Sequence, residues 1–151
     1  DLTRIYGVGV SNGAGLVNKI AKETGIFQAI APLLSQQSEA IAQTVSPSAL
    51  SVFQVNGGQD ELVPADGGNG VADTVFISAQ SSAENWAANA NCNMVPTSQA
   101  KSWGDYSVEE YTFSDCIEGQ KVRYFIVADA GHSISFGQDF NLYELIWEFF
   151  K

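Results

Sequence analysis

The chain has 151 residues, of which 45% are hydrophobic and 16% are charged, a composition typical of one globular domain with a buried core. The 17 acidic and 7 basic residues give a formal net charge of -10. That charge repels nucleic acid and anionic lipid, so neither is expected as a partner. No apolar run is long enough to span a membrane.

The first part of the chain predicts a parallel strand–helix–strand unit. A β-favouring run predicts a strand over Arg4–Val8, and a helix is expected after the turn at Gly9–Gly13. Gly25 is placed to end that helix in the left-handed conformation. A short apolar run, Phe27–Ala31, predicts a second, buried strand. The apolar face predicted for the helix consists of Leu16, Val17, Ile20 and Ala21.

The rest of the chain predicts further strands and helices without a linker or an internal repeat. In order, they are a short helix within Glu39–Thr44, a strand over Ala49–Val55, a helix over Ser78–Ala90, a loop over Pro96–Tyr106, strands over Val108–Phe113 and Lys121–Val127, and a helix over Asp139–Phe150. The last two strands are expected to form a hairpin or to be neighbours. The pattern indicates a single α/β domain over residues 1–151, with a mostly parallel sheet and flanking helices.

The turn after the first strand has the spacing Gly9-x-Ser11-x-Gly13. In a nucleophile elbow the serine occupies a strained turn, and small residues two positions before and after it let strand and helix pass closely. The turn also places the hydroxyl near the helix N-terminus, where backbone N–H groups favour negative charge. The pentapeptide also occurs by chance, and glycine-rich turns can bind phosphate, although neither Lys nor Arg accompanies this one. Ser11 is therefore a candidate nucleophile.

A serine nucleophile needs a base and an acid. His132 is the only histidine in the chain, so no other imidazole could take the serine proton. It follows a predicted strand, as does Asp60, and parallel sheets carry their catalytic groups at the carboxyl ends of the strands. The order Ser, Asp, His is the one found in α/β-hydrolases. The alternatives are a solvated loop histidine and an aspartate that only bonds its local backbone.

Three other carboxylates compete for the acid role, namely Glu61, Asp66 and Asp129. Asp129 is too near His132 in sequence to lie on a separate strand end. Asp60 is preferred because it follows the last apolar residue of its strand, Val55, at a distance from which a loop can reach the imidazole.

These residues predict ester hydrolysis through an acyl-enzyme. His132 takes the proton of Ser11 as the hydroxyl attacks an ester carbonyl, and Asp60 fixes the tautomer of the imidazole. The backbone N–H of Asn12 donates to the oxyanion. No cofactor and no metal are expected. Two cysteines, Cys92 and Cys116, are too few and too separated for a zinc site, and could form one disulfide or remain free thiols.

Beyond the elbow, several stretches follow one another in a specific order. They are Asp1–Tyr6 leading into Gly9–Gly13, Phe27–Pro32, Asn56–Pro64 with Asp66–Gly68, Trp86–Cys92, Val108–Cys116, Gly131-His132 and Glu144–Phe150. Through them nearly the whole chain resembles the extracellular polyhydroxybutyrate depolymerase and feruloyl or acetylxylan esterase group of α/β-hydrolases. The resemblance implies that fold, a triad of Ser11, Asp60 and His132, a Cys92–Cys116 disulfide, and a secreted protein.

The chain departs from that group in two places. Members commonly have a glycine before Gly-His and a Trp-Pro shortly after it, where this chain has Ala130 and Ser133-Ile134-Ser135. Members also have several strands before the elbow strand, and a loop there supplies the second oxyanion N–H. The resemblance therefore implies the C-terminal portion of the fold, with Asn12 as its one oxyanion donor.

The elbow strand would then lack its usual neighbour. An unpaired apolar edge invites pairing with another chain, so a homodimer through Arg4–Val8 is expected. Loss of one oxyanion donor costs about 100- to 1000-fold in kcat. The alternative to a secreted esterase or depolymerase is therefore a catalytically weak or inactive α/β module that acts in binding or assembly. The ester substrate stays open, and a polyester and a plant cell-wall ester both fit the resemblance.

Overall fold

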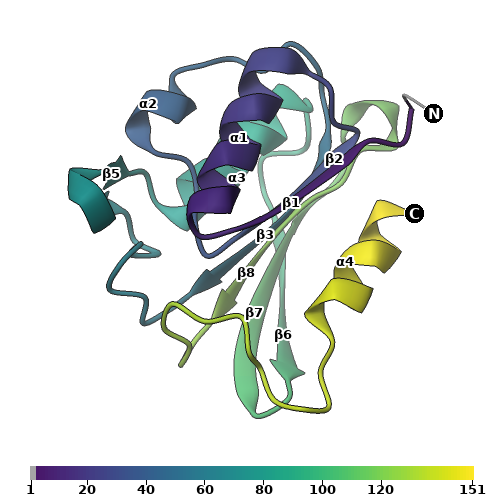
Figure 1. Cartoon of the computed structure of the whole chain (residues 1–151). Coiled ribbons are helices and arrows are strands. Elements are labelled where there is room, and N and C mark those ends of the chain that lie inside the picture. The colour runs from purple at the N-terminus through teal and green to yellow at the C-terminus, as the bar shows by residue number, and fades with distance from the viewer. Residues whose placement is uncertain (1–2) are drawn as a thin grey trace.

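Six strands form one mixed sheet in the order β1-β2-β3-β8-β7-β6 in the computed structural model, which describes residues 3–151 (Figure 1). The first four strands in that order run parallel to one another, and β7 and β6 continue the sheet antiparallel. The strand bounds are β1 Tyr6–Val10, β2 Ala29–Leu33, β3 Ser51–Gly57, β8 Val122–Val127, β7 Tyr106–Phe113 and β6 Thr97–Trp103.

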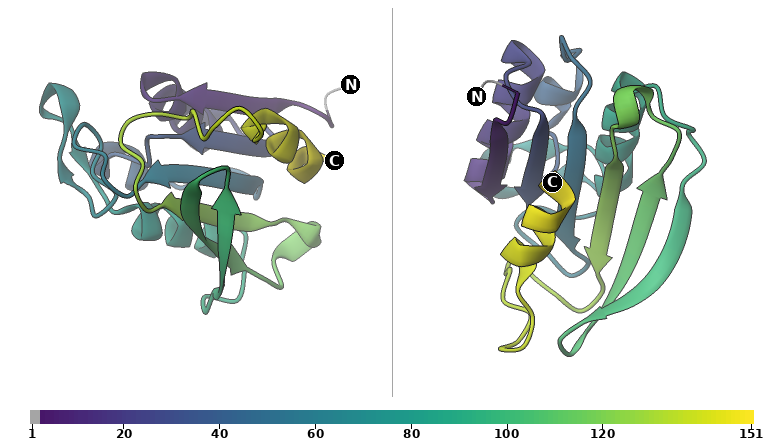
Figure 2. Two further views of the ribbon diagram at one scale, coloured as in Figure 1. Left: turned by 90° about the horizontal axis from the view of Figure 1, so that it is seen from below. Right: turned by 90° about the vertical axis from the view of Figure 1, so that its right-hand side faces the viewer.

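Helices cover both faces of this sheet. The right-hand view of Figure 2 places α4 in front of the sheet, with α1 and α3 behind it. Their bounds are α1 Asn12–Thr24, α2 Glu39–Ala42, α3 Ala79–Asn89 and α4 Leu142–Phe150. Two very short strands, β4 Gly68–Asn69 and β5 Val75–Phe76, and a single turn of 3-10 helix between them lie in the segment after β3. The predicted α/β class is confirmed.

Each face of the sheet has its own apolar core, because successive strand residues point to opposite faces. Under α4, the rings of Phe53 and Phe125 lie tilted to one another with centroids 4.5 Å apart. On the opposite face, Trp86 of α3 is buried in one cluster with Val52 and Val122 of the sheet. The apolar residues of the helix predicted over Ser78–Ala90 are buried, namely Ala79, Ala83, Trp86, Ala87 and Ala90. The cores therefore hold the parallel strands rigidly between two layers of helix.

One predicted element is wrong. The segment expected as a loop, Pro96–Tyr106, contains β6, which pairs with β7 through a two-residue turn at Gly104-Asp105. Every residue of β6 except Trp103 is exposed, so the strand lacks the apolar alternation that marks a half-buried strand. The Gly-Asp turn is the signal that could have identified it.

The predicted apolar face of α1 is also partly wrong. Leu16 is 57% exposed, whereas the polar residues Asn18 and Lys22 are buried. Trp86 explains this, because its Nε1 donates a hydrogen bond to Asn18 Oδ1 and its ring lies 4.4 Å from Lys22 Nζ. Burial lowers the pKa of Lys22 to about 8. The left-handed end of the helix at Gly25 is confirmed, with φ 61°.

β1 lies at one edge of the sheet. Within the described part of the chain it pairs with β2 alone. Its side chains Val8 and Val10 are 44% and 37% exposed. The elbow strand therefore presents an open edge and an uncovered apolar strip.

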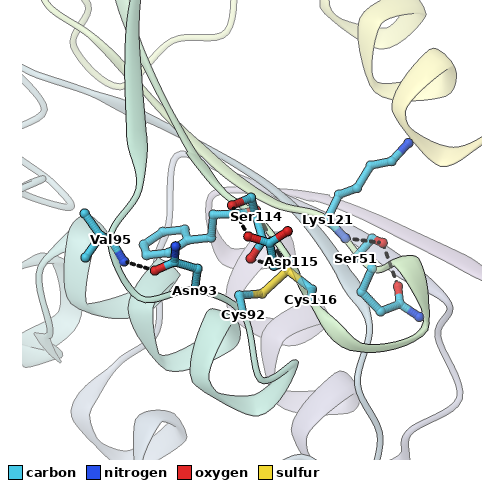
Figure 3. The surroundings of a disulfide bond; sticks show 10 residues. Ser51, Cys92, Asn93, Val95, Ser114, Asp115, Cys116 and Lys121 are labelled. Carbon is cyan, nitrogen blue, oxygen red and sulfur yellow. Dashed lines mark hydrogen bonds between the residues drawn. A yellow bond between two sulfur atoms is a disulfide. The ribbon is translucent and has the colours of Figure 1, made fainter.

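A disulfide joins Cys92, just after α3, to Cys116, just after β7 (Figure 3). The pairing implied by the resemblance is confirmed. A backbone hydrogen bond from Asn93 N–H to the Ser114 carbonyl, 2.8 Å long, runs alongside it. Among residues 3–151, no helix is long and apolar enough to cross a membrane.

Candidate active site

Ser11 stands alone between the end of β1 and the start of α1, in a strained backbone conformation with φ 53° and ψ −118°. A non-glycine residue in such a region costs about 1–3 kcal/mol and persists only where its surroundings hold it. The Ser11 N–H donates to the Leu33 carbonyl at 2.8 Å, and the Ser11 carbonyl accepts from the N–H groups of Ala14 and Gly15. These bonds fix the turn and lift the hydroxyl clear of the sheet.

The two glycines of the pentapeptide play different parts. A Cβ atom at Gly9 would lie 2.2 Å from the Gly13 carbonyl oxygen, so strand and helix could not approach with any side chain there. A Cβ atom at Gly13 would meet no heavy atom within 4 Å. The expected need for a small residue is therefore correct before Ser11 and wrong after it, because only the backbone of Gly13 faces the strand.

Another close approach brings the segments after β3 and β8 together. A Cβ atom at Gly57 would lie 2.3 Å from the Gly131 carbonyl oxygen, and one at Gly58 would lie 2.7 Å from the Ala128 carbonyl oxygen. The Gln59 N–H also donates to the Ala130 carbonyl at 2.9 Å. The loop that carries Asp60 therefore lies against the loop that carries His132.

The structure brings the three predicted residues together at the carboxyl edge of the parallel strands. His132 Nε2 lies 2.7 Å from Ser11 Oγ, and His132 Nδ1 lies 2.6 Å from Asp60 Oδ2. The Asp60 side chain is 1% exposed and the His132 side chain is 21% exposed. The aspartate is thus shielded from water, whereas the imidazole stays open to a substrate.

Asp60 also bonds its local backbone. Its Oδ1 accepts hydrogen bonds from the N–H groups of Leu62 and Val63, each at 2.9 Å. Asp60 therefore does not only bond its local backbone, because one carboxylate oxygen contacts the loop and the other contacts the imidazole. In the described residues, none of the three competing carboxylates hydrogen-bonds the imidazole; all three are exposed.

These contacts define the protonation pattern of the imidazole. An ionised carboxylate only accepts, so His132 Nδ1 carries the hydrogen that bonds Asp60. In the neutral ring Nε2 is then left as the acceptor for the Ser11 hydroxyl. Asn12 begins α1, where the first N–H groups lack partners inside the helix and can donate to an anion. The arrangement can remove a proton from Ser11 and stabilise negative charge beside it.

A groove of about 650 Å³ opens beside Ser11. It runs between α1, the segment after β2, α2 and the loop that follows Asp60. Its apolar walls are formed by Leu16, Ile41, Val63, Val71 and Phe76. Its polar lining includes Asn12, Lys19, Ser35, Gln36, Ser38 and Thr74. The groove is large enough for a small organic ligand.

A buried polar network, which sequence reasoning missed, supports the wall of this groove. Gln36 Nε2 donates to the carbonyls of Pro64 at 2.8 Å and Ile77 at 3.0 Å, which lie at the two ends of the loop after Asp60. Asn56 Nδ2 donates to Gln36 Oε1 at 2.8 Å. Gln54 Nε2 donates to Asn56 Oδ1 at 3.0 Å. The sequence signal that could have indicated this network is the pair of polar residues Gln54 and Asn56 inside the buried strand β3.

No group of three or more His, Cys, Asp or Glu side chains in residues 3–151 could hold a metal ion. Comparison with protein-family models, with curated proteins and with solved structures finds no match to this chain. The inference about function therefore depends on the geometry around Ser11.

Proposed function

We propose that the protein is a serine carboxylic-ester hydrolase of the secreted esterase or depolymerase type, built on an α/β-hydrolase-like fold. The observation that carries the proposal is the position of the only imidazole in the chain. His132 lies within hydrogen-bond distance of both Ser11 Oγ and Asp60 Oδ2. Ser11 itself occupies a strained strand-to-helix turn of the kind that exposes nucleophiles.

The reaction would proceed in two halves. His132 Nε2 takes the Ser11 proton while Oγ bonds to the ester carbonyl carbon, and the negative charge on the carbonyl oxygen is met by the Asn12 N–H. The imidazolium then gives its proton to the leaving alcohol oxygen as the carbon–oxygen bond breaks. A water molecule, deprotonated by the same imidazole, hydrolyses the acyl-enzyme. Asp60 holds the ring and stabilises its positive charge throughout.

Two further features support the secreted type. The Cys92–Cys116 disulfide is compatible with an oxidising, extracellular setting. The order of Ser11, Asp60 and His132 in the chain and the motifs that surround them resemble the extracellular depolymerase and esterase group. Polyesters and plant cell-wall esters are the substrate classes that this resemblance suggests.

Hydrolysis of p-nitrophenyl acetate and butyrate tests the proposal. The expected result is turnover that Ser11→Ala abolishes, together with covalent labelling of Ser11 by an organophosphonate. Ser98→Ala is a matched control, because Ser98 lies exposed on β6, away from the site. Absence of both turnover and labelling in the wild-type protein would overturn the proposal.

A second candidate function is favoured by the open edge of β1. On this alternative the chain is a catalytically weak or inactive module whose edge serves in binding or assembly. Among the described residues, the Asn12 N–H is the oxyanion donor assigned here, and an oxyanion hole with one donor fewer costs about 100- to 1000-fold in kcat. Labelling of Ser11 without measurable turnover would favour this alternative.

In either case we propose that two copies pair through the outer edge of β1. Tyr6–Val10 carries no charged side chain, so no like charges would face each other along the paired strands. Sedimentation velocity should show a dimer, and Val8→Lys should dissociate it. Val45→Lys, at a side chain that is 81% exposed and lies outside β1, is the control. A monomer at high protein concentration would contradict the dimer.

A further inference from the structure

The groove beside Ser11 follows the axis of α1. One side of the first two turns of the helix lines it, through Ser11, Asn12, Gly15, Leu16 and Lys19. At 1.5 Å per residue, Ser11 and Lys19 are separated by roughly 12 Å along the axis. The groove therefore offers a linear path that starts at the nucleophile.

The chemistry of the walls is mostly apolar. Leu16 and Val71 contribute apolar surface that the chain leaves 57% and 48% exposed. Among residues 3–151, Lys19 is the one charged residue in the lining, and it forms an ion pair with Glu23. An uncharged aliphatic chain would cover the exposed surface, whereas a charged substituent would lose water without gaining a free partner.

The position of the imidazole decides which half of an ester fits there. The leaving alcohol oxygen must lie near His132 Nε2 to receive its proton. His132 is not part of the groove lining, whereas Ser11 and Asn12 are. The alcohol therefore departs on the imidazole side, and the acyl chain, which stays bonded to Ser11, extends along α1.

We propose that this groove is the acyl-binding site and that it selects uncharged, medium-length aliphatic acyl groups over acetyl. This inference rests on the proposed function of Ser11, which it deepens by naming the substrate class. In the first half-reaction the acyl carbon bonds to Ser11 Oγ, the bond to the alcohol oxygen breaks, and the alcohol leaves with the proton. The acyl chain lies in the groove until water releases it as a carboxylate.

Gly15 offers a substitution that narrows the groove without disturbing the fold. It lines the groove, and a Cβ atom there meets no heavy atom within 4 Å. Gly15→Phe should fill the path of the acyl chain. Gly15→Ala is the matched control, since it also replaces the helical glycine but adds only a Cβ atom.

Two series of esters separate the acyl side from the alcohol side. With p-nitrophenol as the common leaving group, kcat/KM should rise at least about tenfold from acetyl to octanoyl, because each buried methylene adds to binding. Gly15→Phe should remove this gain, so that its ratio of kcat/KM for octanoyl to acetyl falls at least about tenfold below the ratio for Gly15→Ala. Acetate esters of methanol, butanol and octanol should show no such rise. A preference for long alcohols with short acyl groups would overturn the assignment.

A binding measurement tests the groove independently of catalysis. Octanamide should bind the Ser11→Ala protein in a calorimetric titration, acetamide should not, and adding Gly15→Phe should abolish octanamide binding. If no ester is hydrolysed but this binding pattern holds, the proposed function fails and the groove remains an apolar-chain site. If short esters are hydrolysed without any acyl-length preference and octanamide does not bind, the inference about the groove is overturned alone.

Discussion

Asp60 holds His132 through one carboxylate oxygen and its own loop through the other. Oδ2 lies 2.6 Å from His132 Nδ1, while Oδ1 accepts two backbone N–H groups at 2.9 Å. Asp60→Asn keeps the loop contact at Oδ1 but can present an N–H to Nδ1, which favours the wrong imidazole tautomer. We expect kcat for p-nitrophenyl butyrate to fall by about 10,000-fold with little change in stability. Asp66→Asn, in the same loop and exposed, should be neutral. Equal losses in both variants would assign Asp60 a structural role only.

The two glycines around Ser11 should respond differently to alanine. Gly9→Ala places a Cβ atom 2.2 Å from the Gly13 carbonyl oxygen, and this clash should lower the free energy of unfolding by about 3 kcal/mol or more. Gly13→Ala meets no heavy atom within 4 Å and lies in a helix, so it should be neutral or stabilising. Urea unfolding of both variants checks this difference. Similar losses would show that the elbow is packed differently.

Lys22 gives the protein a specific pH dependence. Its pKa is lowered by burial from 10.5 to about 8, so between these values the unfolded chain binds more protons than the folded one. The free energy of unfolding therefore rises as the pH increases from about 8 to 10.5. Below about pH 8, the full cost of burying the charged ammonium group lowers the stability. Lys22→Met should remove the rise and be at least as stable at neutral pH. Urea unfolding from neutral to alkaline pH measures it.

The control for that variant is Lys19→Met, because Lys19 lies exposed on the same helix and pairs with Glu23. It should keep the alkaline rise. A Lys22→Met protein that loses stability at every pH would mean that the contacts of the ammonium group with Trp86 and Asn85 outweigh its desolvation.

The polar network behind the groove should act as a unit. Gln36→Met leaves Asn56 Nδ2 and the Ile77 carbonyl without this partner, and each unpaired buried group costs about 1–3 kcal/mol. The Pro64 carbonyl loses one of its two hydrogen bonds and keeps the one from the Gly67 N–H. Adding Asn56→Leu should cost less than the sum of the single changes, because the two residues share a bond. Urea unfolding of the double-mutant cycle tests this coupling. Strictly additive losses would contradict it, and exposed Gln80→Met is a control for loss of an amide.

The disulfide should stabilise the fold without affecting the chemistry. It closes a loop of 24 residues, which corresponds to about 3 kcal/mol. The disulfide lies just beyond Phe113, the last residue of β7, which pairs with Val122 at the start of β8. His132 follows the opposite end of β8. Cys92→Ser/Cys116→Ser should therefore unfold at lower urea concentration yet keep wild-type kcat. A large loss of activity in the folded double variant would link the two ends of the sheet.

The local sequence pattern predicted much of the candidate site, because Ser11, Asp60 and His132 each follow a strand that is recognisable by its apolar residues. The order of Ser11, Asp60 and His132 along the chain and the carboxyl-edge rule for parallel sheets were sufficient to expect their meeting. The same reasoning missed β6, since an exposed edge strand carries no apolar alternation. It also placed Leu16 on the buried face of α1 and missed the burial of Asn18 and Lys22 there. The residue that covers these two polar groups, Trp86, comes from a helix distant in sequence.

The groove could not be predicted for a related reason. Its walls come from α1, α2 and the loop between β3 and α3, and their separation depends on the contacts of Gln36 with Pro64 and Ile77. Hydrogen bonds between side chains and distant carbonyls leave no periodic trace in a sequence. Only the folded chain shows that the exposed Leu16 borders a path to Ser11.

His132 is the only histidine in 151 residues, and it lies between Ser11 and Asp60. Any histidine-selective spectroscopic signal from this protein therefore reports on that position alone. A sample labelled with nitrogen-15 in histidine would give one imidazole ring, whose Nδ1 and Nε2 resonances distinguish the tautomers directly. The protein thus contains its own single-site probe of the protonation state at the centre of the proposed triad.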